Sequence, residues 1–152
     1  MRPRAIIFED DDTLRALLLN ILHQRDYEVI SASSPMGCPV YEDLTALCPH
    51  EYACGDFLIT DNNMPAMTGL EFVQAQEQRG CKGVVRNKAV MSACWADNEL
   101  TLANSLGCKV FKKPFRISEI NNWLDEREKR IPYDRKLEDL DLLSSADHRG
   151  TK

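Results

Sequence analysis

The chain has 152 residues, a length that predicts one domain and leaves no room for several. Hydrophobic residues make up 43% and charged residues 28%, the balance of an ordinary globular protein rather than a disordered or fibrous one. The formal net charge of -5 disfavours direct binding to nucleic acid, whose phosphates carry the same sign of charge.

Short apolar runs recur along the chain, and stretches with helical periodicity lie between them. These runs are rich in β-branched and aromatic residues, which favour strands. They are Ala5–Phe8, Val29–Ile30, Phe57–Thr60, Ala89–Met91 and Val110–Phe111. Because strands and helices alternate, the sequence predicts an α/β protein with a mostly parallel sheet.

Four stretches are predicted to be helical. The first carries one apolar stripe, formed by Leu14, Leu17, Leu18, Ile21 and Leu22, and ends before Tyr27. The second opens at Thr68, whose hydroxyl can form a capping box with Glu71. The third closes at Gly107, which can adopt the left-handed cap conformation. The fourth carries Ile117, Ile120 and Leu124 on one side.

Two regions look less regular. Residues 33–55 contain several prolines and glycines, so only Val40–Leu47 is expected to be helical there. After the last helix, Ile131-Pro132 is expected to end helical structure. We therefore expect one domain over residues 1–130 and a charged tail over 131–152, disordered at Ser144–Lys152.

Polar residues follow four of the five predicted strands. Glu9 and Asp10 follow the first, Asp61 the third, Ser92 the fourth and Lys113 the fifth. The carboxyl ends of parallel strands share one edge of the sheet, and ligands bind there. Carboxylates gathered at that edge would repel one another unless a hard cation such as Mg2+ neutralised them. Together with a lysine and a hydroxyl, they suit phosphoryl transfer onto a carboxylate.

These motifs, in this order, resemble the receiver domain of two-component response regulators, from Arg4 to Leu124. The resemblance rests on Phe8-Glu9-Asp10-Asp11, Leu14-Arg15, Asp61-Asn62-Asn63-Met64-Pro65 with Gly69-Leu70, Met91-Ser92-Ala93 and Lys113-Pro114-Phe115. It implies a flavodoxin-like five-stranded parallel sheet in the order 2-1-3-4-5, with helices on both faces. It also implies a cis Lys113-Pro114 bond.

The resemblance also implies a role for each site residue. Asp61 would be the phosphoacceptor, and Mg2+ would be held by Glu9, Asp10, Asp61 and the backbone carbonyl of Asn63. Asp10 would bind the ion directly and Glu9 through water.

Two further residues would contact the phosphoryl group. Ser92 would hydrogen-bond its oxygen and draw in the loop after the fourth strand, and Lys113 would pair with it. The donor would be a histidine kinase or a phosphotransfer protein of a phosphorelay. The chain would be a phosphoacceptor rather than a turnover enzyme.

The sequence departs from the receiver pattern in three ways. Val110 stands where many receivers carry a switch aromatic, and Phe111 is an imperfect substitute. Residues 33–55 are longer than usual and carry Cys38, Cys48 and Cys54. No output domain follows, so the chain resembles stand-alone receivers that signal through a partner protein. The leucines of the tail suit a helix docked on its own domain or a homodimer contact.

Several residues keep a second interpretation. Asp11 and Asp12 suit a solvated helix start. Trp123 is expected to pack, whereas Trp95 suits either packing or binding. The cysteines 38, 48 and 54 with His50 could form a metal site, although the spacing matches no standard zinc motif. Small buried side chains or redox-sensitive thiols are the alternative, and we expect Cys38, Cys48 and Cys54 to lie away from the phosphorylation site.

Two other functions remain open. Ile6 to Leu14 superficially resembles the opening motif of haloacid-dehalogenase phosphatases, but their nucleophilic aspartate would be Glu9 here. The chain could also be a receiver-like interaction module that signals without phosphate.

The expected location is cytoplasmic, with no membrane contact. The start of the chain lacks the apolar core of a secretory signal, and no apolar run approaches the roughly 20 residues that span a bilayer. The six cysteines include no C-x-x-C pair, so reduced thiols are expected.

Overall fold

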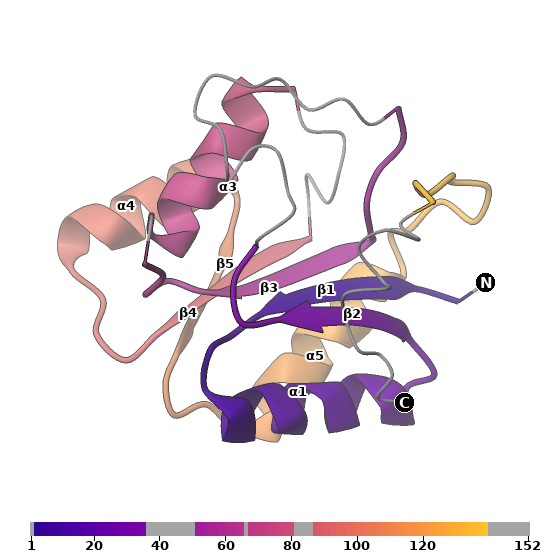
Figure 1. Ribbon diagram of the computed structural model, residues 1–152, viewed down its shortest axis with the longest axis horizontal. Coiled ribbons are helices and arrows are strands. Elements are labelled where there is room, and N and C mark those ends of the chain that lie inside the picture. Colours follow the sequence, from indigo (N-terminus) through magenta and orange to yellow (C-terminus); the bar gives the residue numbers. More distant parts are fainter. Residues whose placement is uncertain (1, 36–50, 66, 81–86, 140–152) are drawn as a thin grey trace.

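The computed structural model describes residues 2–35, 51–65, 67–80 and 87–139. Its centre is a parallel sheet of five strands in the order β2-β1-β3-β4-β5 (Figure 1). The strands are β1 (Arg4–Phe8), β2 (Glu28–Ala32), β3 (Phe57–Asp61), β4 (Lys88–Ser92) and β5 (Lys109–Lys112). The predicted fold class and strand order are therefore confirmed.

Helices cover both faces of the sheet. They are α1 (Asp12–Gln24), α3 (Gly69–Gln78), α4 (Asp97–Leu106) and α5 (Ile117–Glu128). Helices α1 and α5 cover one face, and α3 and α4 the other (Figure 1). Strands β3 and β4 are buried along their whole length, which explains why their sequences read as nearly continuous apolar runs. None of the described helices is long and apolar enough to cross a membrane.

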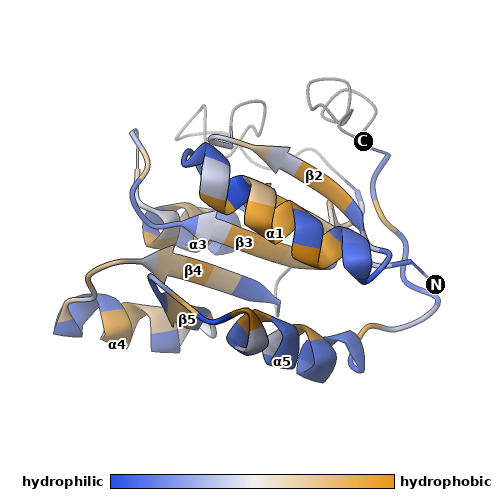
Figure 2. Ribbon diagram, turned by 90° about the horizontal axis from the view of Figure 1, so that it is seen from below, coloured by the Kyte–Doolittle hydropathy of each residue, from blue (hydrophilic) through white to orange (hydrophobic). Residues whose placement is uncertain are grey.

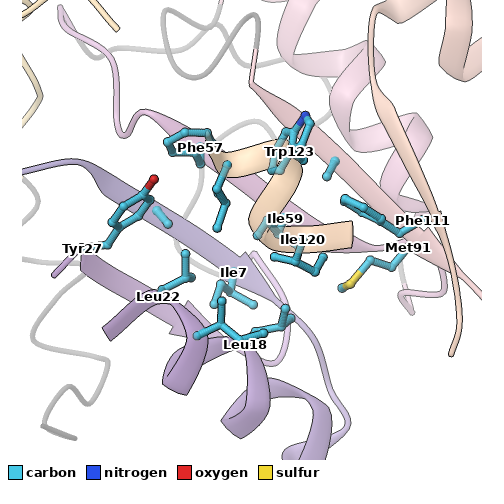
Figure 3. Packing of buried hydrophobic residues seen from close by; sticks show 14 residues of the cluster. Ile7, Leu18, Leu22, Tyr27, Phe57, Ile59, Met91, Phe111, Ile120 and Trp123 are labelled. Carbon is cyan, nitrogen blue, oxygen red and sulfur yellow. The ribbon is translucent and has the colours of Figure 1, made fainter. Parts of the chain in front are cut away.

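The core between the sheet and helices α1 and α5 is rich in aromatic rings (Figure 3). Tyr27 stacks on Phe57, and Trp123 meets both Phe57 and Phe111 edge to face. Such arrangements add to the gain from burying the rings. The expected packing role of Trp123 is confirmed.

Local signals in the sequence set the helix ends. Asp11 caps α1, because its carboxylate accepts hydrogen bonds from the backbone of Thr13 and Leu14. The apolar stripe of α1 faces the sheet (Figure 2). The capping box of α3 forms as predicted, and Gly107 adopts the left-handed conformation at the end of α4, with φ of 73°.

The apolar side of α5 is buried only in part. Ile120 and Leu124 are buried, but Ile117 is 49% exposed. Ile117 is the first residue of the helix, which begins beyond the carboxyl end of β5. Phe115, in the preceding turn, packs against the core cluster instead.

After α5, residues 131–139 return to the amino ends of the strands. The predicted site lies at the opposite, carboxyl ends. Arg135 forms two hydrogen bonds to the buried carboxylate of Asp56, at 2.9 and 2.6 Å. Glu138 bonds to Ala53 through its backbone, and the guanidinium of Arg4 donates to its carbonyl oxygen. Residues 131–139 are thus held against the domain, and the boundary at residue 130 remains a prediction.

Several expectations lie outside the described residues. These are the helix at Val40–Leu47, the surroundings of Cys38, Cys48, Cys81 and His50, and the disorder at Ser144–Lys152. Cys54, Cys94 and Cys108 are described, and Cys94 and Cys108 are free thiols.

Candidate functional site

The register of the sheet brings the predicted site residues to one edge. Asp61 ends β3, Ser92 ends β4, and Lys113 follows β5. The backbone N–H of Lys113 donates to the Ser92 carbonyl at 2.9 Å. Because all strands are parallel, these residues and the acidic turn after β1 share the carboxyl edge.

Three carboxylates meet at this edge. One oxygen from each of Glu9, Asp10 and Asp61 lies within 4.8 Å of the others. Glu9 is 1% and Asp61 3% exposed, whereas Asp10 is exposed to solvent. Two of the negative charges are therefore largely removed from water, and the third remains accessible.

Lys113 supplies a positive charge to the cluster. Its Nζ lies 3.0 Å from Glu9 Oε1 and 3.3 Å from Asp61 Oδ1. The Lys113-Pro114 peptide bond is cis, as predicted. The two contacts of Nζ place the ammonium against the carboxylates rather than in solvent.

The electrostatics of Glu9 and Lys113 reflect this pairing. Burial raises the pKa of the Glu9 carboxyl, and the hydrogen bonds from the Asp11 backbone and from Lys113 offset the rise only in part. Burial alone would lower the pKa of Lys113. The hydrogen bond to Glu9 and the charges of Asp61 and Glu9 outweigh that effect, so its pKa lies above the ordinary value.

The donor set fits a divalent cation. Three carboxylates face a single ammonium group, so the ionised cluster carries an excess of negative charge. Oxygen ligands with one exposed member are the environment in which Mg2+ binds while keeping several waters. The acidic cluster is therefore a candidate metal site in which Glu9, Asp10 and Asp61 would hold the ion.

Asn63 lies beside the cluster. Its backbone N–H donates to Asp61 Oδ1 at 3.2 Å, which helps to orient the carboxylate. Its side chain is exposed, and the role expected for its backbone carbonyl remains a prediction.

Ser92 is at the same edge, but its hydroxyl is engaged elsewhere. Its Oγ donates to the Cys94 carbonyl at 3.0 Å and accepts from the Cys94 N–H at 3.2 Å. A hydroxyl has one proton to donate. Ser92 must therefore release the Cys94 carbonyl before it can donate to any other acceptor.

The two residues considered for the switch position face opposite sides of the sheet. Val110 packs partly buried with the α3 and α4 cluster, whereas Phe111 is 3% exposed in the other core (Figure 3). Trp95 packs against the same α3 and α4 cluster as Val110, and its indole donates to the Phe111 carbonyl at 3.1 Å. Trp95 is thus partly buried against its own domain.

The sequence motifs include three residues that shape the site but gave no role to any of them. Arg15 donates to the Glu9 carbonyl at 2.6 Å and pairs with Asp12. Asn62 is buried beside Asp61 and bonds to α3 and α4. Asn62 and Arg15 fall within the receiver-like motifs, but only their three-dimensional contacts indicate what they do.

Gly69 is the third. A Cβ atom added there would lie 2.6 Å from the Asp61 carbonyl oxygen, closer than side-chain carbons approach backbone oxygens. The backbone N–H of Gly69 also donates to the Asn62 carbonyl at 3.0 Å. The first residue of α3 is therefore glycine because the chain of the site loop passes directly against it.

No protein-family model matches the chain, and no curated protein matches its sequence. Solved structures are similar in fold. The chemotaxis protein CheY4 of Vibrio cholerae is 21% identical, with a TM-score of 0.62 over 83% of this chain and 98% of that one. The signal receiver domain of a putative LuxO repressor protein from Vibrio parahaemolyticus is 17% identical, with a TM-score of 0.66 over 86% and 92%. The HemR receiver domain from Leptospira biflexa, in its non-phosphorylated form, is 22% identical, with a TM-score of 0.61 over 83% and 94%. At these identities the similarity shows a shared fold.

Proposed function

We propose that this chain, which has the fold of response-regulator receiver domains, accepts a phosphoryl group on Asp61 and signals through a partner protein. The donor is a histidine kinase or a phosphotransfer protein, and Mg2+ is the metal. The chain acts as a phosphoacceptor and not as a turnover enzyme.

One observation carries the proposal. The carboxylates of Glu9, Asp10 and Asp61 and the ammonium of Lys113 converge at the carboxyl edge of a receiver-type sheet. These groups come from three separate parts of the chain, so local turn chemistry does not explain their meeting.

The reaction follows from the chemistry of the groups. A carboxylate oxygen of Asp61 attacks the phosphorus of a phosphohistidine, an O–P bond forms, and the P–N bond breaks. The imidazole leaves with the electron pair of that bond and takes up a proton, while Asp61 becomes an acyl phosphate. Bound Mg2+ supplies positive charge that offsets the negative oxygens.

Two residues of the chain contribute directly to that step. Lys113 is placed to exchange its bond with Asp61 for one with a phosphoryl oxygen, since its Nζ already lies 3.3 Å from the carboxylate. Glu9 keeps the ammonium at the edge of the cluster through its 3.0 Å contact. Ser92 would turn its hydroxyl from Cys94 toward the phosphoryl group.

The test is to identify the residue that becomes phosphorylated. The chain is incubated with acetyl phosphate and Mg2+, digested, and analysed by mass spectrometry for phosphorylated peptides that hydroxylamine discharges. Phosphate on Asp61 supports the proposal. Phosphate on Glu9 or Asp10 would support the alternative in which the loop after β1 carries the nucleophile, as in haloacid-dehalogenase phosphatases.

A chain that takes no phosphate from acetyl phosphate or from a phosphohistidine donor would support the receiver-like module that signals without phosphate. The folded state of that sample is checked by circular dichroism, and Mg2+ binding by calorimetry. A folded chain that binds Mg2+ but takes no phosphate contradicts the proposed function.

A further inference from the structure

Asn62 joins two helices through one buried side chain. The residue follows Asp61 directly and is 2% exposed. Its Oδ1 accepts a hydrogen bond from the backbone N–H of Leu70 at 3.1 Å, and its Nδ2 donates to Glu99 Oε2 at 3.2 Å. Leu70 is the second residue of α3 and Glu99 the third of α4. The amide therefore connects the first turns of both helices beside the proposed phosphoacceptor.

The partners determine the orientation of this amide. A backbone N–H can only donate and an ionised carboxylate can only accept, so the oxygen faces α3 and the nitrogen faces α4. An aspartate at this position would place a second carboxylate against Glu99. Asparagine therefore satisfies both contacts, and its acidic counterpart satisfies only one.

Helix α4 depends on Glu99. Its N-cap residue, Ala96, has no side-chain acceptor, and Glu99 Oε1 accepts the Ala96 N–H at 3.0 Å instead. Among the ten residues of α4, all of them described, Ala103 alone is buried, and Leu100 is 41% exposed. Helices with little buried surface are among the first elements to open locally. The contact with Asn62 is thus a substantial part of what holds the first turn of α4.

We propose that Asn62 is a positioning residue that couples the loop bearing Asp61 to helix α4. The inference rests on the proposed phosphorylation of Asp61. The backbone of Asn62 is held by the Met91 carbonyl at 2.8 Å and by the Gly69 N–H at 3.0 Å. Its side-chain bond to Glu99 reaches α4, so a shift of the loop on phosphorylation passes to the first turn of that helix.

The test reverses the donor and the acceptor in the hydrogen bond between residues 62 and 99. Asn62→Asp keeps the acceptor for Leu70 but sets two carboxylates against each other at Glu99. Adding Glu99→Gln restores the bond with its polarity reversed, because the new amide donates to the aspartate and still accepts from Ala96. The double variant also has the net charge of the parent. Asn98→Asp, an exposed change in the first turn of α4, controls for the added charge.

Hydrogen–deuterium exchange is measured first without phosphate, at the Ala96 and Leu100 amides, which donate to the Glu99 side chain and to the Ala96 carbonyl. In Asn62→Asp these amides should exchange at least about tenfold faster, as expected for the loss of one charge-assisted hydrogen bond. The double variant should match the parent, and Asn98→Asp should exchange no faster than the parent, because an acidic residue in the first turn of a helix is favourable. Unchanged exchange in Asn62→Asp, or no recovery in the double variant, overturns the proposed bridge.

The same variants are then labelled with acetyl phosphate and Mg2+. In the parent and the double variant, exchange in α4 should change by at least about threefold when Asp61 is phosphorylated. Asn62→Asp should take up phosphate without that change, and a response equal to that of the parent overturns the coupling. If the parent takes up no phosphate, the proposed function and the coupling both fail, while the phosphate-free comparison still decides whether Asn62 holds α4.

Discussion

The ammonium of Lys113 lies 3.0 Å from the carboxylate of Glu9, nearer than the 3.3 Å that separates it from Asp61. Glu9 is 1% exposed, so the lysine is the counter-charge of a buried acid as well as a neighbour of the proposed phosphoacceptor. The lysine is therefore held in place before any phosphoryl group arrives, and it carries the same sign of charge as the metal expected in this site.

Lys113→Ala should show separately how the lysine affects Mg2+ binding and how it affects phosphate uptake. Removing the ammonium removes its repulsion of Mg2+. We therefore expect Mg2+ to bind about tenfold tighter at pH 8, which is the order of magnitude expected when one like-charge contact is lost. Phosphate uptake from acetyl phosphate should nevertheless fall by at least about tenfold, because a stabilising charge on the phosphoryl oxygens is lost. Calorimetry and intact-mass labelling measure the two quantities.

Lys112→Ala is the matched control, because Lys112 is exposed on the neighbouring position of β5. It should leave both quantities unchanged. Weaker Mg2+ binding in folded Lys113→Ala would contradict the placement of the metal beside this lysine.

Asp10→Asn should make the chain less dependent on Mg2+. Asp10 is the exposed member of the cluster, so its neutralisation relieves repulsion without leaving a buried partner. We expect higher thermal stability than the parent in chelator. We also expect Mg2+ affinity to fall at least about tenfold, which removes about 1.4 kcal/mol of metal-linked stabilisation at saturation.

Thermal melts with chelator and with Mg2+ test this expectation. Asp26→Asn, an exposed change at the opposite end of α1 with φ of 61°, should melt no lower than the parent and should gain as much stability from Mg2+ as the parent does. An Asp10→Asn variant that gains as much stability from Mg2+ as the parent would remove Asp10 from the metal site.

Gly69→Ala should disturb the site through the backbone. The new Cβ would lie 2.6 Å from the Asp61 carbonyl oxygen, and that oxygen cannot yield as a flexible side chain could. We expect a loss of about 1 to 3 kcal/mol in the free energy of unfolding and slower phosphorylation of Asp61.

Gly80→Ala provides the comparison. Gly80 has φ of 72°, and a Cβ atom added there would have no described atom within 4 Å, so alanine is strained but meets none of the described residues. It should cost about 1 kcal/mol and leave the phosphorylation rate unchanged. Equal phosphorylation rates for the two variants, each measured where it is folded, would count against the close approach at Gly69.

Arg135→Ala should destabilise the domain far from the site. Arg135 is the charge partner of Asp56, whose side chain is 4% exposed. Leaving that carboxylate buried without the guanidinium should cost about 3 kcal/mol, measured by urea unfolding. Arg130→Ala breaks an exposed pair with Glu126 and should cost less than about 0.5 kcal/mol. Similar losses in the two variants would show that residues 131–139 are not held as described.

Much of the site was predictable because strand ends are local features. A parallel sheet brings every carboxyl end to one edge, so Asp61 and Lys113 could be placed together without knowledge of the intervening loops. The capping box of Thr68 and Glu71 was predictable for the same reason, since its partners are three residues apart.

Other contacts depend on how elements pack and leave no local pattern. Asn62 and Glu99 are separated by 37 residues, and their bond depends on the relative placement of α3 and α4. Arg135 and Asp56 are separated by 79 residues. The sequence therefore predicted only a charged tail, although part of that tail is bound to the sheet. The exposure of Ile117 likewise depends on where α5 begins relative to β5.

Phosphorylation of Asp61 itself is the most direct test of the account. The parent, Asp61→Asn and the exposed control Asp26→Asn are incubated with Mg2+ and acetyl phosphate, and the phosphoryl group is counted by intact mass before and after hydroxylamine. The parent and Asp26→Asn should each gain one hydroxylamine-sensitive phosphoryl group, and folded Asp61→Asn should gain none, because an amide is a poor nucleophile. Equal labelling of Asp61→Asn and the parent would contradict the assignment of the site.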